Sequence, residues 1–180
     1  LIPLVILARG YLPADDALRH AAKAVSGRPW RTILVLHEAF VLDPHPGWHA
    51  LLGALQPVLG GGVEPLVLFS VSALFLLAMA PPALALRRPE AWMLALAAVC
   101  AAQPDWIERL MLGRPFLVSV AALLCIALSW PALEQRRERR WPAMAWQALW
   151  MALAVWIHGN WYLWLLPWGC VWFARGRRAA

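Results

Sequence analysis

Residues 66–86 read LVLFSVSALFLLAMAPPALAL, a run of apolar and small residues without a charged side chain. A helix that crosses the hydrocarbon core of a bilayer needs about 20 such residues. We therefore expect this run to span a membrane. Pro81 and Pro82 are expected to kink the span, which neighbouring helices can accommodate.

Further apolar runs lie on both sides of this one. Residues 116–133 have full spanning length, residues 142–157 are slightly short, and residues 91–102 and 161–174 are shorter still. Short runs can span by thinning the bilayer locally or by using their flanks. With residues 1–8 as the end of a first span, the sequence predicts an all-α, polytopic bundle of about five to six spans in a single membrane domain.

The composition agrees with a membrane protein. The chain is 62% hydrophobic and only 14% charged, whereas soluble domains are about 45–50% apolar and about 25% charged. The net charge of +6 does not indicate a nucleic-acid partner, because the basic residues stand at the ends of apolar segments. Cys100, Cys125 and Cys170 lie inside apolar segments at no metal-like spacing and are expected to be small buried hydrophobic residues.

Arginine sets the expected orientation. Nine arginines lie in three connections, residues 87–88, 136–140 and 175–178. By the positive-inside rule these connections are cytoplasmic. Alternation then places the other connections, residues 9–65, 103–115 and 158–160, on the extracytoplasmic side. That side holds all five histidines: His20, His37, His45, His49 and His158.

The long first outer loop, residues 9–65, is expected to contain amphipathic helices. Residues 16–25 are predicted to be helical, ending at Gly27. The predicted apolar stripe of this helix is Leu18, Ala21, Ala22 and Val25. Residues 46–59 are predicted to form a helix at the membrane interface, while residues 32–42 fit helix and strand equally well.

Asp15 and Asp16 are the candidate catalytic residues. One acid at a helix N-terminus is sufficient for capping, and two adjacent acids repel each other. The alternative role is a general base, or a carboxylate that holds a metal, facing a membrane-bound substrate.

Arg114, Arg109 and His158 are the candidate substrate-binding residues. Arg114 stands at the mouth of a span, where its guanidinium suits bidentate binding of phosphate; the alternative is an interfacial arginine that snorkels. Arg109 and Asp105 are spaced as a helical ion pair. His158 and Asn160 flank a glycine between two apolar arms, at a depth where polar residues tend to be paired or functional.

Two other patterns, in the tryptophans and in three of the histidines, do not favour a ligand-binding site. The thirteen tryptophans fit an aromatic belt and helix packing better than they fit stacking on a sugar. A metal site built from His37, His45 and His49 matches no common metal motif in its spacing, so the metal requirement stays open.

Four motifs resemble those of the GT-C superfamily of membrane glycosyltransferases, and they occur in the same order as in that family. Members of the family use sugars linked to polyprenyl phosphate. The first is the acidic pair in a Y-x-x-x-D-D-A-x-x-H setting, residues 11–20. PGWHALLGAL (46–55), RLMLGRPF (109–116) and WIHGN (156–160) follow. The last resembles the family's W-x-N-x-HG turn, although Asn160 follows His158 and Gly159 instead of preceding them.

The resemblance implies inverting transfer of a sugar from a polyprenyl-phosphate carrier to a glycan, lipid or protein acceptor at the extracytoplasmic face. It implies that Asp15 or Asp16 is the general base or helps to position a divalent metal. Arg114 with Arg109 would stabilise the departing phosphate, and His158 and His20 would bind substrate. The implied location is the bacterial inner membrane, with lipid-linked sugar and membrane lipids as partners.

A transporter or lipid-carrier flippase with a polar outer cavity is the alternative function. Such a protein should carry ionisable residues near mid-bilayer and repeat symmetry, and the sequence shows neither. A structural assembly subunit is a third class, and it would leave the outer Asp, Arg and His residues dispersed. The positions of these residues in the fold therefore discriminate the classes.

Overall fold

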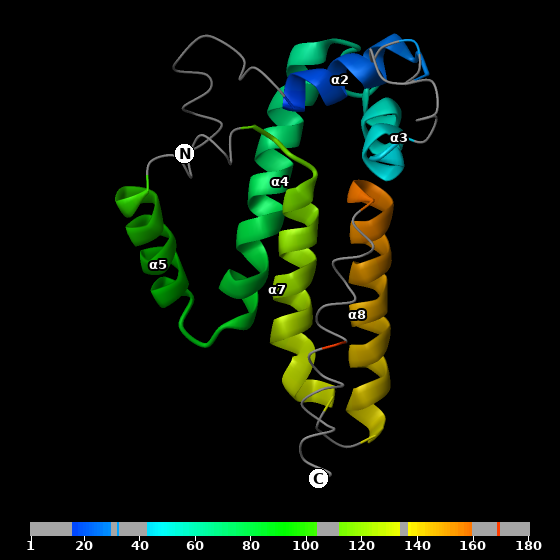
Figure 1. Cartoon of the computed structure of the whole chain (residues 1–180). Coiled ribbons are helices and arrows are strands. Elements are labelled where there is room, and N and C mark those ends of the chain that lie inside the picture. The colour runs from blue at the N-terminus through cyan, green and yellow to red at the C-terminus, as the bar shows by residue number, and fades with distance from the viewer. Residues whose placement is uncertain are drawn as a thin grey trace.

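The computed structural model describes residues 16–29, 43–103, 112–133 and 137–159, together with Thr32 and Gly169. These residues form six helices, and no strand occurs among them (Figure 1). The helices are α2 (Asp16–Ser26), α3 (Pro46–Leu55), α4 (Val63–Ala85), α5 (Pro89–Ala102), α7 (Phe116–Leu133) and α8 (Arg137–His158). The expected all-α class therefore holds for the described part of the chain.

Two helices, α4 and α7, are long and apolar enough to cross a membrane. The expectation of about five to six spans is not supported in the described residues. α5 has only 14 residues, and α8 has the length but opens with the charged segment at residues 137–140. The expected spans at residues 1–8 and 161–174 lie outside the described residues, apart from Gly169.

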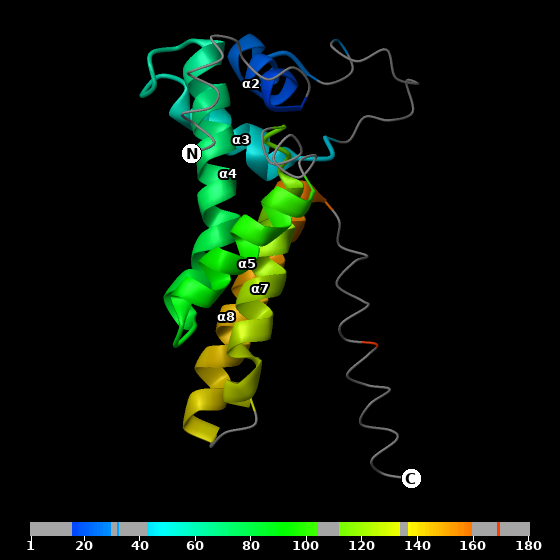
Figure 2. The same cartoon turned by 90° about the vertical axis from the view of Figure 1, so that its left-hand side faces the viewer.

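The long helices alternate in direction. α4 and α7 run from the end that carries α2 and α3 to the opposite end, α5 and α8 run the other way, and the end of α8 meets α3 (Figures 1 and 2). Consequently α2, α3, the turn before α7 and the end of α8 gather at one end. The arginine-bearing connection at residues 87–88 lies at the opposite end, as does the start of α8.

The core joins the two short helices to the long ones. α7 packs between α4 and α8, α2 packs on α4 and α3, and α3 packs on α8. Ala17 and Ala21 of α2 and Leu52 of α3 are fully buried in the same cluster as Leu66 and Val71 of α4. Burial of a leucine such as Leu52 stabilises this packing by about 1.5–3 kcal/mol, which holds α2 and α3 at the end of the bundle.

The outer faces of α4 and α7 are apolar. Only 33% of the apolar window of α4 and 39% of that of α7 is buried inside the structure. Leu76 and Leu84 on α4 and Leu123 on α7 are exposed. Apolar surface of this extent is typical of faces that contact lipid or another protein.

α4 also continues through Pro81 and Pro82 to Ala85. The carbonyls of Leu77 and Ala78 receive no bond from residues four positions on, because proline has no N–H. α5 returns along α4 and keeps none of its residues buried. A hydrogen bond of 3.0 Å from Trp92 Nε1 to the carbonyl of Met79 joins the two helices.

Candidate functional site

The candidate site lies where α2 and α3 meet the start of α7 and the end of α8. α2 presents two polar residues inward: Asp16 and His20 are buried on the same face as Ala17 and Ala21. The predicted apolar stripe is wrong in part, because Leu18 is 37% exposed and Ala22 is exposed. Hydrophobicity alone does not identify the inward face here, since that face carries the charged and imidazole groups of the site.

Asp16 is held between two guanidinium groups. Its Oδ2 lies 2.5 Å from Nε of Arg114, and its Oδ1 pairs with Arg19 one turn along α2. The aspartate side chain is 13% exposed, whereas those of Arg114 and Arg19 are 48% and 52% exposed. The two arginines therefore present cationic surface to solvent around a buried carboxylate, which is an arrangement suited to anions.

A close backbone contact brings Arg114 to this position. The N–H of Ala17 donates to the carbonyl of Leu112 at 2.9 Å. Gly113 between Leu112 and Arg114 has a φ of 60°, and a Cβ there would lie 2.8 Å from the Cβ of Ala17. Only glycine allows both this conformation and this approach.

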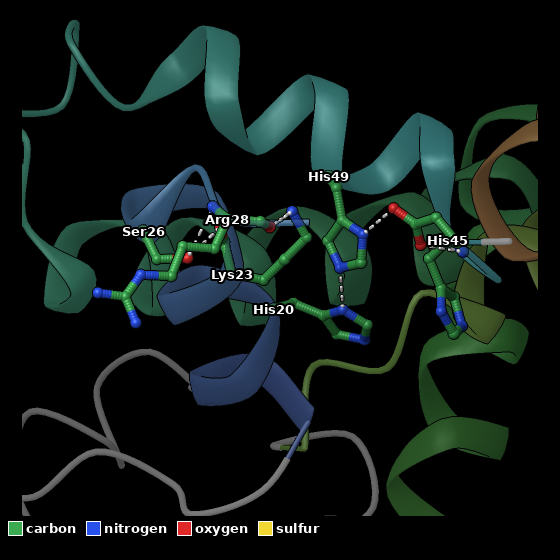
Figure 3. A network of polar contacts seen from close by, with 7 residues as sticks. His20, Lys23, Ser26, Arg28, His45 and His49 are labelled. Carbon is green, nitrogen blue, oxygen red and sulfur yellow. Dashed lines mark hydrogen bonds and ion pairs between the residues drawn. The ribbon is translucent and has the colours of Figure 1, made fainter. Parts of the chain in front are cut away.

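Four histidines form a second group beside the arginines. The ring centroids of His20 and His45 lie 4.9 Å apart, those of His20 and His49 also 4.9 Å, and those of His45 and His158 5.1 Å. His20 comes from α2, His49 from α3, and His158 from the end of α8 (Figure 3 shows the first two with His45). We call these residues the histidine cluster.

Two glycines let α8 reach the cluster. A Cβ on Gly47 would lie 2.8 Å from the carbonyl oxygen of Trp156, and one on Gly159 would lie 2.7 Å from the carbonyl oxygen of Pro44. Gly47 of α3 therefore touches the backbone of α8, and Gly159 after α8 touches the backbone of the segment before α3. Phe116 at the start of α7 packs against His158 with ring centroids 6.2 Å apart, which links the cluster to the arginine side of the site.

Hydrogen bonds order part of the cluster. Nδ1 of His49 lies 2.6 Å from Oδ2 of Asp43, and Nε2 of His49 lies 2.7 Å from Nδ1 of His20. Asp43 also accepts a bond of 2.8 Å from the N–H of His45. This chain runs from His20, which is 3% exposed, to the Asp43 side chain, which is 26% exposed.

The cluster favours neutral imidazoles. Burial lowers the pKa of His20 to about 3, with smaller contributions from His45, His49 and Arg19. Burial also lowers the pKa of His45 to about 4, assisted by His158 and His49. The pKa of His49 is lowered by burial as well, but its hydrogen bond to Asp43 opposes the shift. Desolvation of the charged form is the dominant cause in each case.

Two buried nitrogen atoms of the cluster have no hydrogen-bond partner among the described residues: Nδ1 of His45 and Nδ1 of His158. Buried polar atoms are nearly always paired, and unpaired ones call for an explanation. A polar group of a bound substrate beside these two rings would satisfy them. The cluster thus combines an ordered half, made by Asp43, His49 and His20, with a half that is open to a ligand.

The structure accounts for the candidate residues as follows. Asp16, Arg114, His20 and His158 lie in this site, whereas Asp15, Arg109, His37 and Asn160 lie outside the described residues. Among the residues that the structure describes, no group of three or more His, Cys, Asp or Glu side chains is arranged to hold a metal ion. The rings of His45 and His49 lie 6.1 Å apart in the histidine cluster.

Sequence reasoning did not single out Asp43 or Arg19. Their signals were present: Asp43, His45 and His49 stand close together in DPHPGWH, and Arg19 stands one turn after Asp16. Both signals are short and common, so neither identifies a site without the fold.

The chain matches no protein family model, and no curated protein or solved structure is significantly similar to it. The resemblance in the four sequence motifs therefore has no independent support from these comparisons. Function has to be argued from the geometry and chemistry of the site itself.

Proposed function

We propose that the protein is a multi-pass membrane glycosyltransferase that moves a sugar from a polyprenyl-phosphate carrier to an acceptor hydroxyl with inversion. One observation carries the proposal: the Asp16–Arg114 pair and the histidine cluster converge at one end of helices long enough to cross a membrane. A lipid carrier places its phosphate at the membrane surface, where such a polar end would meet it.

The proposed orientation puts this end on the extracytoplasmic side of the inner membrane. It follows from the arginines at the opposite end, which the positive-inside rule assigns to the cytoplasm. In this arrangement α5 and α8 also cross or enter the bilayer beside α4 and α7. The exposed apolar faces of α4 and α7 support lipid contact.

Each group of the site has a role in this reaction. Arg114 and Arg19 stabilise the phosphate, which gains charge as the bond from the sugar carbon to the phosphate oxygen breaks. The acceptor oxygen forms the new bond at the opposite face of that carbon and loses its proton to a base. Asp15 and Asp16 are the candidate bases from sequence, and Arg109 is a further candidate for phosphate. His158, His45 and His20 hydrogen-bond substrate.

The test measures transfer of labelled sugar from a synthetic polyprenyl-phosphate donor by the full-length protein in proteoliposomes. We expect Arg114→Gln and the double variant Asp15→Asn/Asp16→Asn to lose at least about 100-fold in rate, as removal of electrostatic stabilisation or of a base does. Glu90→Gln, which changes an exposed carboxylate at the start of α5, should keep the full rate.

Two results would refute the proposal in different ways. Movement of the intact lipid-linked sugar between leaflets without any transfer would identify a flippase. Full transfer activity in Asp15→Asn/Asp16→Asn and in Arg114→Gln would show that the site described here is not the site of the reaction.

A further inference from the structure

The hydrogen bonds among Asp43, His49 and His20 have a defined direction. A carboxylate only accepts, so Nδ1 of His49 donates to Asp43. A neutral imidazole has one N–H, and Nε2 of His49 must therefore accept the bond from Nδ1 of His20. It follows that His20 carries its proton on Nδ1 and a lone pair on Nε2.

The free lone pair faces the open half of the histidine cluster. In Figure 3 the second ring nitrogen of His20 points away from His49, to the side on which His45 lies. The ring of His45, at 4.9 Å from that of His20, carries the unpaired Nδ1. A substrate hydroxyl placed there meets the lone pair of His20 and the polar atoms of His45 and His158.

Asp16 is less well placed for the same task. Both of its carboxylate oxygens are engaged by guanidinium groups, one by Arg114 and the other by Arg19. The position of Asp16 between Arg114 and Arg19 suits a role in holding these two side chains in place.

His20 alone would also be a poor base, because burial lowers its pKa to about 3. The charged groups that act on it are His45, His49 and Arg19, which disfavour a proton, and Asp43, which favours one. The chain of hydrogen bonds resolves this difficulty. A proton arriving at Nε2 is matched by movement of the Nδ1 proton to His49 and of the His49 proton to Asp43. No buried imidazolium has to persist, and the Asp43 side chain is 26% exposed to water.

We propose that Asp43, His49 and His20 form a proton relay in which Nε2 of His20 accepts the proton of the acceptor hydroxyl and Asp43 passes a proton to solvent. This inference rests on the proposed function and assigns the base to His20 instead of Asp16. His20 is the catalytic residue; His49 and Asp43 are positioning residues that act through it.

The step balances in atoms and charge. The acceptor oxygen bonds to the sugar carbon and gives its proton to Nε2 of His20. The bond between that carbon and the phosphate oxygen breaks, and its electron pair leaves with the polyprenyl phosphate beside Arg114. The relay ends with a proton on Asp43 and with His20 and His49 as Nε2–H tautomers. Asp43 gives its proton to water, and exchange of the two ring protons with water restores the Nδ1–H tautomers before the next turnover.

A first test reads the proton positions directly and needs no activity. Full-length protein labelled with ¹⁵N in its imidazoles is studied by NMR at neutral pH, with assignments from His20→Gln and His49→Gln. We expect both residues as the Nδ1–H tautomer, and we expect Asp43→Asn to change the tautomer populations of both. An Nε2–H tautomer for either residue would overturn the relay, even if sugar transfer is observed.

A second test uses rates of sugar transfer between pH 5.5 and 9. We expect His20→Gln to lose about 10²–10⁴-fold, the usual contribution of a general base. Asp43→Asn and His49→Gln should lose less. Asp43→Glu, which keeps the carboxylate, should restore much of the rate that Asp43→Asn loses. Arg28→Gln, an exposed change after the end of α2, is the matched control.

The outcomes separate the relay from the proposed function. Transfer that survives in His20→Gln with an unchanged pH profile overturns the relay and leaves the glycosyltransferase proposal standing. Absence of transfer in the unmodified protein overturns the glycosyltransferase proposal, and the NMR result then decides alone whether the relay exists.

Discussion

Nε of Arg114, just before α7, lies 2.5 Å from Oδ2 of Asp16, the first residue of α2. This contact ties the first described helix to a turn far along the chain. Because the aspartate is largely buried and the arginine is half exposed, the pair lies at the boundary between the core and solvent.

A double-mutant cycle measures this contact. Asp16→Asn, Arg114→Gln and the double variant are compared by the free energy of unfolding in detergent. We expect a coupling energy of about 0.5–3 kcal/mol, the range for residues in direct contact. Asp16→Asn with Arg19→Gln is the matched cycle within one helix. Strictly additive effects for Asp16 and Arg114 would contradict the contact.

Gly113→Ala is expected to destabilise the protein more than Gly27→Ala. Both glycines have positive φ, 60° and 61°, so each substitution costs about 1–2 kcal/mol in backbone strain. A Cβ on Gly113 also meets Ala17 and Val71, whereas one on Gly27 meets nothing within 4 Å. Overpacking should add about 1–3 kcal/mol at Gly113. Equal free energies of unfolding for the two variants would show that the turn before α7 does not pack closely against α2.

Gly47→Ala and Gly53→Ala form a second matched pair within α3. A Cβ on Gly53 meets nothing within 4 Å, so alanine there should stabilise the helix by about 0.5–1 kcal/mol. A Cβ on Gly47 would collide with the side chain and carbonyl of Trp156. We expect Gly47→Ala to lose about 1–3 kcal/mol and to weaken the contact between His45 and His158. Denaturant titration measures both, and stabilisation by both substitutions would contradict the packing of α3 on α8.

Stability should fall on acidification. The pKa of His20 is lowered to about 3 and that of His45 to about 4, both by burial. An unfolded histidine has a pKa of about 6.5. Below that pH the unfolded state binds more protons than the folded state, so stability is lost as the pH falls from about 6.5 toward 4. Each group contributes up to about 1.4 kcal/mol per pH unit.

Unfolding of the protein in detergent at several pH values between 7.5 and 4.5 checks this slope. His20→Gln and His45→Gln should each flatten it, because glutamine does not titrate. Stability that stays constant or rises over this range in the unmodified protein would be inconsistent with neutral, buried imidazoles.

Parts of the fold follow from the sequence because they depend on local chemistry. Residues 116–133 were expected as one span and form α7 with the same bounds. α4 begins at Val63, three residues earlier than the apolar run, because a helix can start among polar residues that a bilayer would exclude. α8 begins at Arg137 for the same reason.

The contacts among the candidate residues did not follow from the sequence. The alternation of connections predicts that Asp16, Arg114 and His158 lie at one end of the bundle, and Asp16 contacts Arg114 while His158 packs on Phe116 two residues further on. The pairing of His20 with His49, however, depends on how α2 and α3 pack on each other, and residues 29 positions apart in the chain make that contact. The inward face of α2 was missed because a helix can pack through polar groups when they find partners.

The position of α2 has a consequence for the order in which the protein is made. The N–H of Ala17 binds the carbonyl of Leu112, and Asp16 binds Arg114. α2 leaves the ribosome first among the described helices and its packing partners α3 and α4 follow directly, yet Leu112 and Arg114 are synthesised only after α5. Contacts of such long sequence separation form late in folding. The N-terminal end of α2 therefore gains its bonds to Leu112 and Arg114 only after the turn before α7 has been made.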